Sequence, residues 1–377
     1  MRKILVMGGS YMQSGFIETA INKGFNITIL DRDSKCLYAG DQRIEFHEID
    51  ISDEVKVDAF LSDHSFDACI APVSEVGNIT LSKLAKKHKF YYNSEETISL
   101  TTNKLALRNK LKRQSSHSHQ FFTYNEVKEN SETLPYPLIV KPAQSSASRG
   151  VSLVKSSNEF EPAIQYALNF CNKDELLIEK YAEGKQYSIE TISYQGKHEI
   201  VAVVEENMSP APYFIERSDI IDIEQQEGLK LLLSDYVIDL LNSLNIEVGP
   251  CHLEVKIDGN EIFLIEIASR SGLLRDRLIA AANIVDYNEL IINAYLKNLN
   301  VVKIENNHNK QNALLNILIY EQDMEKYRLA KEQEKLVDEY FYKEKKLLNK
   351  EIKLTDAYGY FFVSSANRSD FKVLTLV

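Results

Sequence analysis

Residues 249–270 read GPCHLEVKIDGNEIFLIEIASR, and no other segment says more about how this chain folds. Polarity alternates along it, so that His252 and Glu254 share one face of a predicted strand and apolar residues form the other. Asp258-Gly259 is a hairpin turn, after which a second strand carries Glu266. Folding there places Glu254 and Glu266 opposite each other, or one residue out of register, with Cβ atoms about 5 Å apart.

Two carboxylates at that separation repel each other unless a cation lies between them. Oxygen ligands beside a phosphate group are what Mg²⁺ prefers, so Glu254 and Glu266 are predicted metal ligands. Arg270, just beyond the second strand, carries a planar group that fits a phosphate or an acyl phosphate. An ordinary hairpin with a charged face in solvent is the alternative interpretation.

Residues 136–151, YPLIVKPAQSSASRGV, form a second informative segment. A predicted strand ends in Lys141, and a loop of small residues leads into another strand. Such loops expose backbone N–H groups that can fold over phosphates, while the lysine adds a positive charge. The segment is not a Walker A loop, because no G-K-[ST] follows and no helix begins. Taken alone, a mobile hairpin turn would have a similar sequence.

Residues 177–190, LIEKYAEGKQYSIE, form the third segment. A strand ending in Glu179 and Lys180 could present its backbone edge to an adenine. Gln186 or Glu183 could then reach the ribose hydroxyls. Without the other two segments, a charged loop between strands would be the default interpretation.

In this order and spacing, the three segments resemble the ATP-grasp superfamily, and within it the carboxylate–amine ligases; the resemblance runs from residue 1 to about residue 296. It implies ATP and Mg²⁺ (or Mn²⁺) as cofactors. The site residues that it implies are Lys104, Lys141, Ser145, Ser146, Ser148, Gly150, Glu179, Lys180, Tyr181, Glu183 and Gln186 at the nucleotide, Glu254 and Glu266 at the metal, Lys141 and Arg270 in catalysis, and Glu75, His252 and Arg270 at the substrate.

The sequence departs from the family pattern in three places. Ala268 stands where many members have an asparagine that ligates metal, so one oxygen ligand must come from elsewhere or from water. Ala147 replaces a usual glycine and is expected to stiffen the loop. Ser271-Gly272 replaces a usual pair of glycines after the catalytic arginine, which affects how substrate is held there.

The N-terminal segment predicts a parallel α/β sheet. Ile4–Met7 and Ile27–Leu30 are apolar runs, with Gly8-Gly9 and a helical stretch between them. No G-x-G-x-x-G is present, which counts against a nucleotide-dependent oxidoreductase. The expected fold class is α/β and α+β: a Rossmann-like pre-ATP-grasp lobe over residues 1–97, a two-lobed ATP-grasp fold over 98–300 with a mobile lid at about 115–175, and a small α+β C-terminal cap over 301–377.

The composition limits the possible partners. The chain has 377 residues and a net charge of −11, which argues against general affinity for nucleic acid. The apolar run after Met1 is too short for a signal-peptide core or a membrane span, so a cytoplasmic protein is expected. The four cysteines show no metal-binding spacing.

The resemblance predicts an enzyme that joins a small-molecule carboxylate to an amine through an acyl phosphate, releasing ADP and phosphate. It also makes a homodimer plausible. Three other functions stay open on the sequence: an ATP-grasp carboxylase-type enzyme that activates bicarbonate, a nucleotide-dependent oxidoreductase suggested only by the first lobe, and a non-catalytic ATP-binding regulatory protein.

Overall fold

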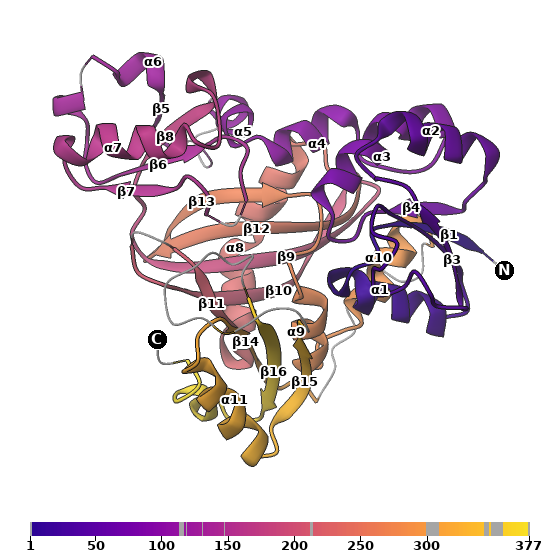
Figure 1. The fold of residues 1–377 in the computed structure, drawn as a ribbon. Helices are drawn as coiled ribbons and strands as arrows, with labels where there is room; N and C mark the ends of the chain where they lie inside the picture. Colours follow the sequence, from indigo (N-terminus) through magenta and orange to yellow (C-terminus); the bar gives the residue numbers. More distant parts are fainter. Residues whose placement is uncertain are drawn as a thin grey trace.

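The computed structural model describes residues 2–112, 117, 119–129, 131–146, 148–211, 214–298, 309–342, 347 and 357–375. Within these ranges the strands form two four-stranded sheets and one eight-stranded sheet. Figure 1 shows the N-terminal lobe, the small lid sheet and the C-terminal strands extending in three directions from the large central sheet.

The N-terminal lobe is a parallel sheet in the order β3-β2-β1-β4, as its apolar runs predict. Ile4–Met7 are fully buried, which suits a strand covered on both faces. Gly8 makes the turn into the first helix with a φ of +101°, a conformation that favours glycine. The elements of this lobe are β1 (Lys3–Met7), α1 (Tyr11–Asn22), β2 (Asn26–Asp31), β3 (Ile44–Glu48), α2 (Glu54–Asp63), β4 (Ala68–Ile70) and α3 (Glu75–His88).

A small antiparallel sheet in the order β5-β8-β6-β7 forms the lid lobe. It has a core of its own, in which Phe160 and Ile164 of one helix pack on Leu138, Val140 and Ile178. A separate core is what a lobe that moves as a unit requires, but the motion of the segment at about 115–175 stays a prediction. The elements are β5 (Phe121–Thr123), α6 (Tyr124–Val127), η1 (Ser131–Thr133), β6 (Leu138–Pro142), β7 (Ser152–Val154), α7 (Ser157–Ala167), η2 (Lys173–Glu175) and β8 (Leu176–Lys180).

The central sheet is antiparallel, in the order β13-β12-β9-β10-β11-β14-β16-β15. One of its faces packs on the long helix α8, where Val237 and Leu240 meet Leu253 and Val255. The strands are β9 (Lys185–Tyr194), β10 (Lys197–Met208), β11 (Glu216–Ile221), β12 (Val248–Asp258), β13 (Glu261–Ala268), β14 (Asn312–Leu318), β15 (Leu336–Phe341) and β16 (Gly359–Ser365). The remaining helices are α4 (Glu95–Thr102), α5 (Lys104–Leu111), α8 (Ile223–Ser243), α9 (Arg275–Ala281), α10 (Tyr287–Tyr295), α11 (Asp323–Glu332) and η4 (Arg368–Phe371).

The C-terminal segment differs from the expected cap. It is α+β in content, but β14, β16 and β15 continue the central sheet beyond β11 instead of forming a separate body on it. Without β14, the buried strand β11 would be a sheet edge with unpaired backbone groups. The predicted mixed α/β and α+β fold class is confirmed. Across the described ranges, no helix combines the length and the apolar character needed to cross a membrane.

Candidate functional site

The open face of the central sheet, opposite α8, carries the polar residues of the 249–270 hairpin. β12 lies between β13 and β9, so each of these residues has two cross-strand neighbours. Glu254 stands opposite Glu266 on one side and Ser188 on the other, and His252 stands opposite Glu190. Cross-strand neighbours point to the same side of a sheet. The predicted opposition of Glu254 and Glu266 is therefore observed.

A cavity of about 570 Å³ lies between this face and the lid sheet. It brings together most of the site residues that the sequence predicts. Those lining it are Lys104, Lys141, Ser145, Ser146, Ser148, Glu179, Lys180, Tyr181, Gln186, His252, Glu254, Glu266 and Arg270. Gly150, Glu183 and Glu75 do not line it.

Lys104 reaches Glu266 from the start of α5. Asn103 ends α4 and caps α5, which puts Lys104 in the first helical position. Its Nζ lies 2.6 Å from Glu266 Oε2 and donates to the carbonyl of Ser145 at 3.0 Å. Burial would raise the pKa of Glu266, but Lys104 outweighs it and lowers that pKa to about 2. The lysine, the loop and the acidic hairpin therefore meet at one point.

Lys141 belongs to a buried triad. Its Nζ lies 2.5 Å from Glu179 Oε2, and Arg108 Nε lies 2.5 Å from Glu179 Oε1. Arg108 also donates to the carbonyls of Leu264 and Ile265 at 2.7 and 3.0 Å. Burial opposes ionisation of Glu179, but Arg108 and Lys141 together lower its pKa to about 2. The triad holds Lys141 in place and ties the lid sheet to the hairpin.

This triad changes the interpretation of Glu179 as part of an adenine-binding edge. β8 lies between β5 and β6, and Glu179 has a cross-strand neighbour on each side, so its backbone is inside the sheet. The backbone N–H of Tyr181 donates to the carbonyl of Pro137 at 2.9 Å. Glu179 lines the cavity with its side chain committed to Arg108 and Lys141, and Lys180 at the end of β8 and Tyr181 after it remain as candidate adenine contacts.

The small-residue loop after Lys141 is held by one hydrogen bond within the loop and another to the segment before β11. Ser145 Oγ donates to the carbonyl of Arg149, and Ser148 Oγ donates to the carbonyl of Phe214, both at 2.9 Å. Gly150 has a φ of +77°, and a Cβ there would lie 2.8 Å from the Pro142 side chain. Gly150 therefore supports the turn by its backbone conformation and does not line the cavity. Ala147 lies outside the described residues.

The two ribose candidates are placed differently. Gln186 lines the cavity and donates to Glu206 Oε2 at 2.8 Å. Glu183 is exposed and does not line the cavity. Of the two alternatives, Gln186 is the one that lines the cavity.

His252 is buried between two carboxylates. Its Nδ1 lies 2.5 Å from Glu190 Oε1, and its Nε2 lies 3.4 Å from Glu254 Oε1. Burial would lower the pKa of His252, but Glu190 and Glu254 outweigh it and raise that pKa to about 10. Glu190 Oε2 also accepts from the backbone N–H of Gly272 at 3.0 Å. A protonated His252 therefore supports Glu254, and Glu190 fixes the turn that follows Arg270.

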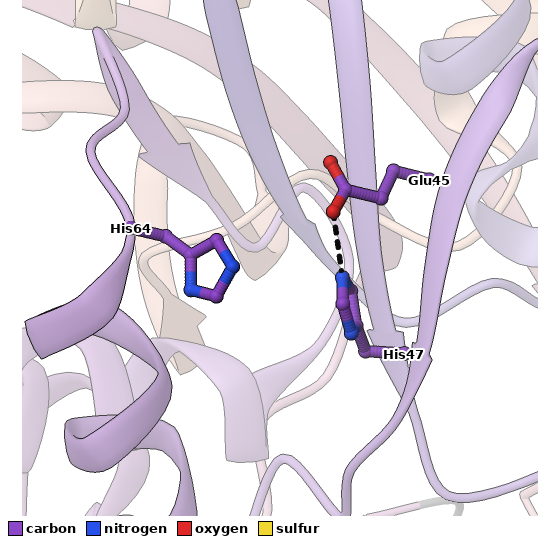
Figure 2. A group of neighbouring side chains, drawn as sticks. All are labelled: Glu45, His47 and His64. Atoms are coloured by element: carbon purple, nitrogen blue, oxygen red, sulfur yellow. Dashed lines mark hydrogen bonds and ion pairs between the residues drawn. The ribbon is translucent and has the colours of Figure 1, made fainter.

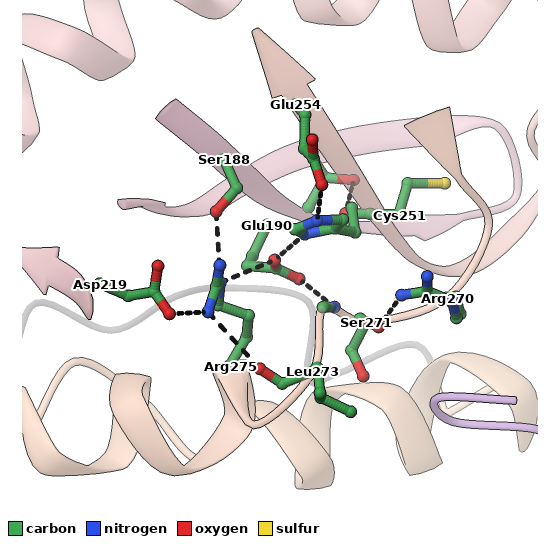
Figure 3. Close-up of polar contacts among 12 residues, drawn as sticks. Ser188, Glu190, Asp219, Cys251, Glu254, Arg270, Ser271, Leu273 and Arg275 are labelled. Carbon is green, nitrogen blue, oxygen red and sulfur yellow. Dashed lines mark hydrogen bonds and ion pairs between the residues drawn. The ribbon is translucent and has the colours of Figure 1, made fainter. Parts of the chain in front are cut away.

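Arg275 is the most important residue that the sequence interpretation missed. Figure 3 shows its guanidinium among the side chains of the open face. It lies 2.6 Å from Asp219, 2.7 Å from Glu206 and 2.8 Å from Glu216. Burial raises the pKa of Glu206 to about 7, and Glu254 and Glu216 add to the effect. The only sequence signal was the presence of charged residues inside strands that are otherwise apolar.

Arg270 and Glu75 lie at the side of the cavity that faces the N-terminal lobe. Arg270 lines the cavity, and its Nη1 donates to the carbonyl of Ser271 at 2.9 Å. Glu75 begins α3, after the cap residue Ser74. Burial raises the pKa of Glu75, and the positive charge of Arg270 opposes that shift. The structure thus places Glu75 near the site but behind its lining.

Comparisons with known proteins agree with this geometry. Residues 134–273 match the model of the ATP-grasp domain. The formate-dependent phosphoribosylglycinamide formyltransferase of Bacteroides thetaiotaomicron is 27% identical over 191 residues, 48% of each chain. The D-alanine–D-alanine ligase of Thermosipho africanus is 28% identical over 169 residues, 41% of this chain and 44% of that one. The match thus spans about half the length of these curated relatives.

A solved structure matches along the whole length. The L-amino acid ligase from Bacillus licheniformis superposes with a TM-score of 0.83 at 18% identity, over 100% of this chain and 96% of that one. At this identity the likeness shows a shared fold. The matched residues 134–273 include both the phosphate-loop segment and the Glu254–Glu266 hairpin, and this part of the chain is accordingly an ATP-grasp domain.

Proposed function

We propose that this protein is an ATP-dependent carboxylate–amine ligase that releases ADP and phosphate. The observation that carries the proposal is that Lys104, Lys141, Arg270 and the facing pair Glu254 and Glu266 border one cavity. Lysines beside a loop of small residues suit a triphosphate, and facing carboxylates suit a divalent cation. The relatives named above, by their printed names one formyltransferase and two amino acid ligases, support the same chemistry.

The residues present fit Mg²⁺ (or Mn²⁺) bound together with nucleotide. Such ions are commonly held by one or two carboxylates plus substrate phosphates, and Glu254 and Glu266 would supply the carboxylates here. When bound, the ion would offset the negative charge of the phosphates. Ala268 supplies no ligand, so the remaining positions would be filled by phosphate oxygens and water.

The proposed reaction has two steps. An oxygen of the substrate carboxylate attacks the γ-phosphorus of ATP, the bond to the β-phosphate oxygen breaks, and ADP leaves. The amine then attacks the carbonyl carbon of the acyl phosphate, and phosphate leaves with the electron pair of its bond to that carbon. Lys104 and Lys141 hold the transferring phosphate, and Arg270 holds the acyl phosphate.

The amine must lose a proton as the new bond forms. Glu206 lines the same cavity, and its raised pKa of about 7 lets it accept a proton near neutral pH. Closure of the lid lobe would keep water from the acyl phosphate, which otherwise hydrolyses.

The experiment is an ADP-release assay over pairs of small carboxylates and amines, with both L- and D-amino acids, followed by mass measurement of the product. Ligase activity requires ADP release that depends on both partners and a product whose mass equals their sum less water. ADP release that needs bicarbonate and one amine would support the carboxylase instead. ATP binding without turnover across the panel would support a regulatory protein.

A further inference from the structure

A cluster on the N-terminal lobe, far from the hairpin in sequence, is built from Glu45, His47 and His64 (Figure 2). Glu45 and His47 are two residues apart on the edge strand β3, so they share one face of it. His64 is the C-cap of α2. One potential ligand atom from each of the three lies within 4.8 Å of those of the other two.

From this arrangement we infer that Glu45, His47 and His64 form a binding site for a divalent transition-metal ion such as Zn²⁺. Two imidazoles and one carboxylate are ligands that Zn²⁺ and its first-row neighbours accept, whereas Mg²⁺ and Ca²⁺ select oxygen ligands. Three protein ligands leave a fourth position for water. The inference does not depend on the proposed ligase function.

The spacing of the first two ligands is close to that of a metal site. His47 Nε2 lies 3.0 Å from Glu45 Oε1, with a hydrogen between them. Two ligand atoms bound to one zinc ion at about 2.0–2.2 Å in tetrahedral geometry lie about 3.3–3.6 Å apart. Zinc could therefore take the place of that hydrogen with only a small adjustment of either side chain, while the His47 ring carries its hydrogen on Nδ1 instead.

The third ligand is oriented by the backbone. His64 Nδ1 lies 2.8 Å from the carbonyl oxygen of Phe60. A carbonyl can only accept, so Nδ1 carries the hydrogen and Nε2 of the neutral ring keeps a free electron pair. Figure 2 shows the His64 ring directed toward Glu45 and His47. A carbonyl behind the ring is a common partner of metal-binding histidines.

Packing restrains the cluster further. The ring of Phe60, which is buried, stacks on His64 at a centroid distance of 4.1 Å and contacts His47 at 4.7 Å. Thr28 Oγ1 donates to Glu45 Oε2 at 3.3 Å, which leaves the other carboxylate oxygen toward His47. Both imidazoles thus rest on one buried ring, and the metal would join the sheet edge to the end of α2.

The test is a zinc titration of the metal-free, full-length protein against a chromophoric chelator, with excess Mg²⁺ present to occupy carboxylate sites. The wild type is expected to bind one zinc ion, with an affinity at least about tenfold above that of His47→Gln or His64→Gln. His88→Gln is the matched control, because His88 pairs with Asp58 at 2.7 Å in the same lobe but belongs to no such group of three among the described residues.

Unfolding temperatures without metal check that the variants fold. Added Zn²⁺ should raise the unfolding temperature of the wild type and of His88→Gln, and leave those of His47→Gln and His64→Gln unchanged. The inference is overturned if the two variants bind zinc as tightly as the wild type, or if the wild type yields all of its zinc to the chelator.

Discussion

The two sides of the cavity hold their buried charges in opposite ways. On the lysine side, formed by Lys104, Lys141 and Arg108 with Glu179 and Glu266, three cations face two carboxylates. On the Arg275 side, formed by Arg275 with Glu206, Glu216 and Asp219, one cation faces three carboxylates. The first side has spare positive charge for phosphates. On the second side, burial raises the pKa values of Asp219 and Glu206, so its carboxylates can take up a proton released by an amine.

The comparison also separates side chains that would bind phosphates from side chains that stabilise the folded protein. Lys104 and Lys141 both line the cavity, where bound phosphates would complete their charge balance. Arg275 has nearly all of its hydrogen-bonding capacity taken up within the protein. We therefore expect substitutions on the lysine side to affect turnover first, and substitutions on the Arg275 side to affect stability first.

The largest effect is expected at the facing carboxylates. Glu254→Gln and Glu266→Gln each remove a charge that would hold the metal, so ADP release should fall by at least about 100-fold. Glu261→Gln is the matched control, since Glu261 is an exposed glutamate on the same hairpin. Full activity in either Glu254→Gln or Glu266→Gln would refute the assignment of both as metal ligands.

The second prediction concerns Arg275. Arg275→Met leaves Asp219, Glu206 and Glu216 buried without a cation, which should lower the free energy of unfolding by about 3–5 kcal/mol. Chemical denaturation measures this directly. Arg275→Lys restores a positive charge without the planar guanidinium group. Its stability should therefore lie between that of the wild type and that of Arg275→Met. If Arg275→Met were as stable as the wild type, the proposed division between the two sides would be lost.

The strand register is the part of the site that the sequence predicts well. A period of two and an Asp-Gly turn limit the pairing of Glu254 and Glu266 to within one residue. The contacts of Arg275 and Glu179 are different, because they depend on which strands from distant segments become neighbours. No local pattern in the sequence carries that information, so Arg275 was missed and Glu179 was given to adenine instead of to Arg108 and Lys141.

The same limit applies to the C-terminal strands and to the His–Glu cluster of the N-terminal lobe. A strand pattern over Tyr360–Val363 indicates a β-strand but not the sheet that it joins, and here it extends the central one. Glu45 and His47 are visible as a pair two residues apart. Their proximity to His64 follows only from the packing of α2 on the sheet edge, with Phe60 between the rings.

The third prediction uses pH to distinguish the lysine side from the pair of His252 with Glu190, which lies next to Arg275. Glu179 and Glu266 have pKa values of about 2, below the ordinary 4.5, so their stabilisation is complete above about pH 4.5 and is lost as the pH falls toward 2. His252 has a pKa of about 10, above the ordinary 6.5, so its stabilisation is complete below pH 6.5 and is lost as the pH rises toward 10. The lysine side thus contributes less stability in acid, and the pair of His252 with Glu190 contributes less stability in alkali.

Chemical denaturation at pH 3, 7 and 9 would measure these opposite slopes. His252→Gln should flatten the loss between pH 7 and pH 9 and leave the loss below pH 4.5 unchanged. Glu206 has a pKa of about 7, raised from 4.5. The stabilisation that its protonated form contributes is complete below pH 4.5 and is lost as the pH rises toward 7. Glu206→Gln should remove that part of the pH dependence alone. An alkaline slope that is equal in wild type and His252→Gln would contradict the assignment of a protonated His252.

The smallest effect is expected at the boundary between the two sides, where Gln186 lines the cavity and hydrogen-bonds to Glu206. Gln186→Leu removes one proposed ribose contact, and one hydrogen bond corresponds to a rise in KM for ATP of about 3- to 10-fold with little change in kcat. Glu183→Gln should leave both constants unchanged, because Glu183 is exposed and outside the lining. The reverse result, a changed KM in Glu183→Gln alone, would assign the ribose contact to the loop before β9 instead of to Gln186.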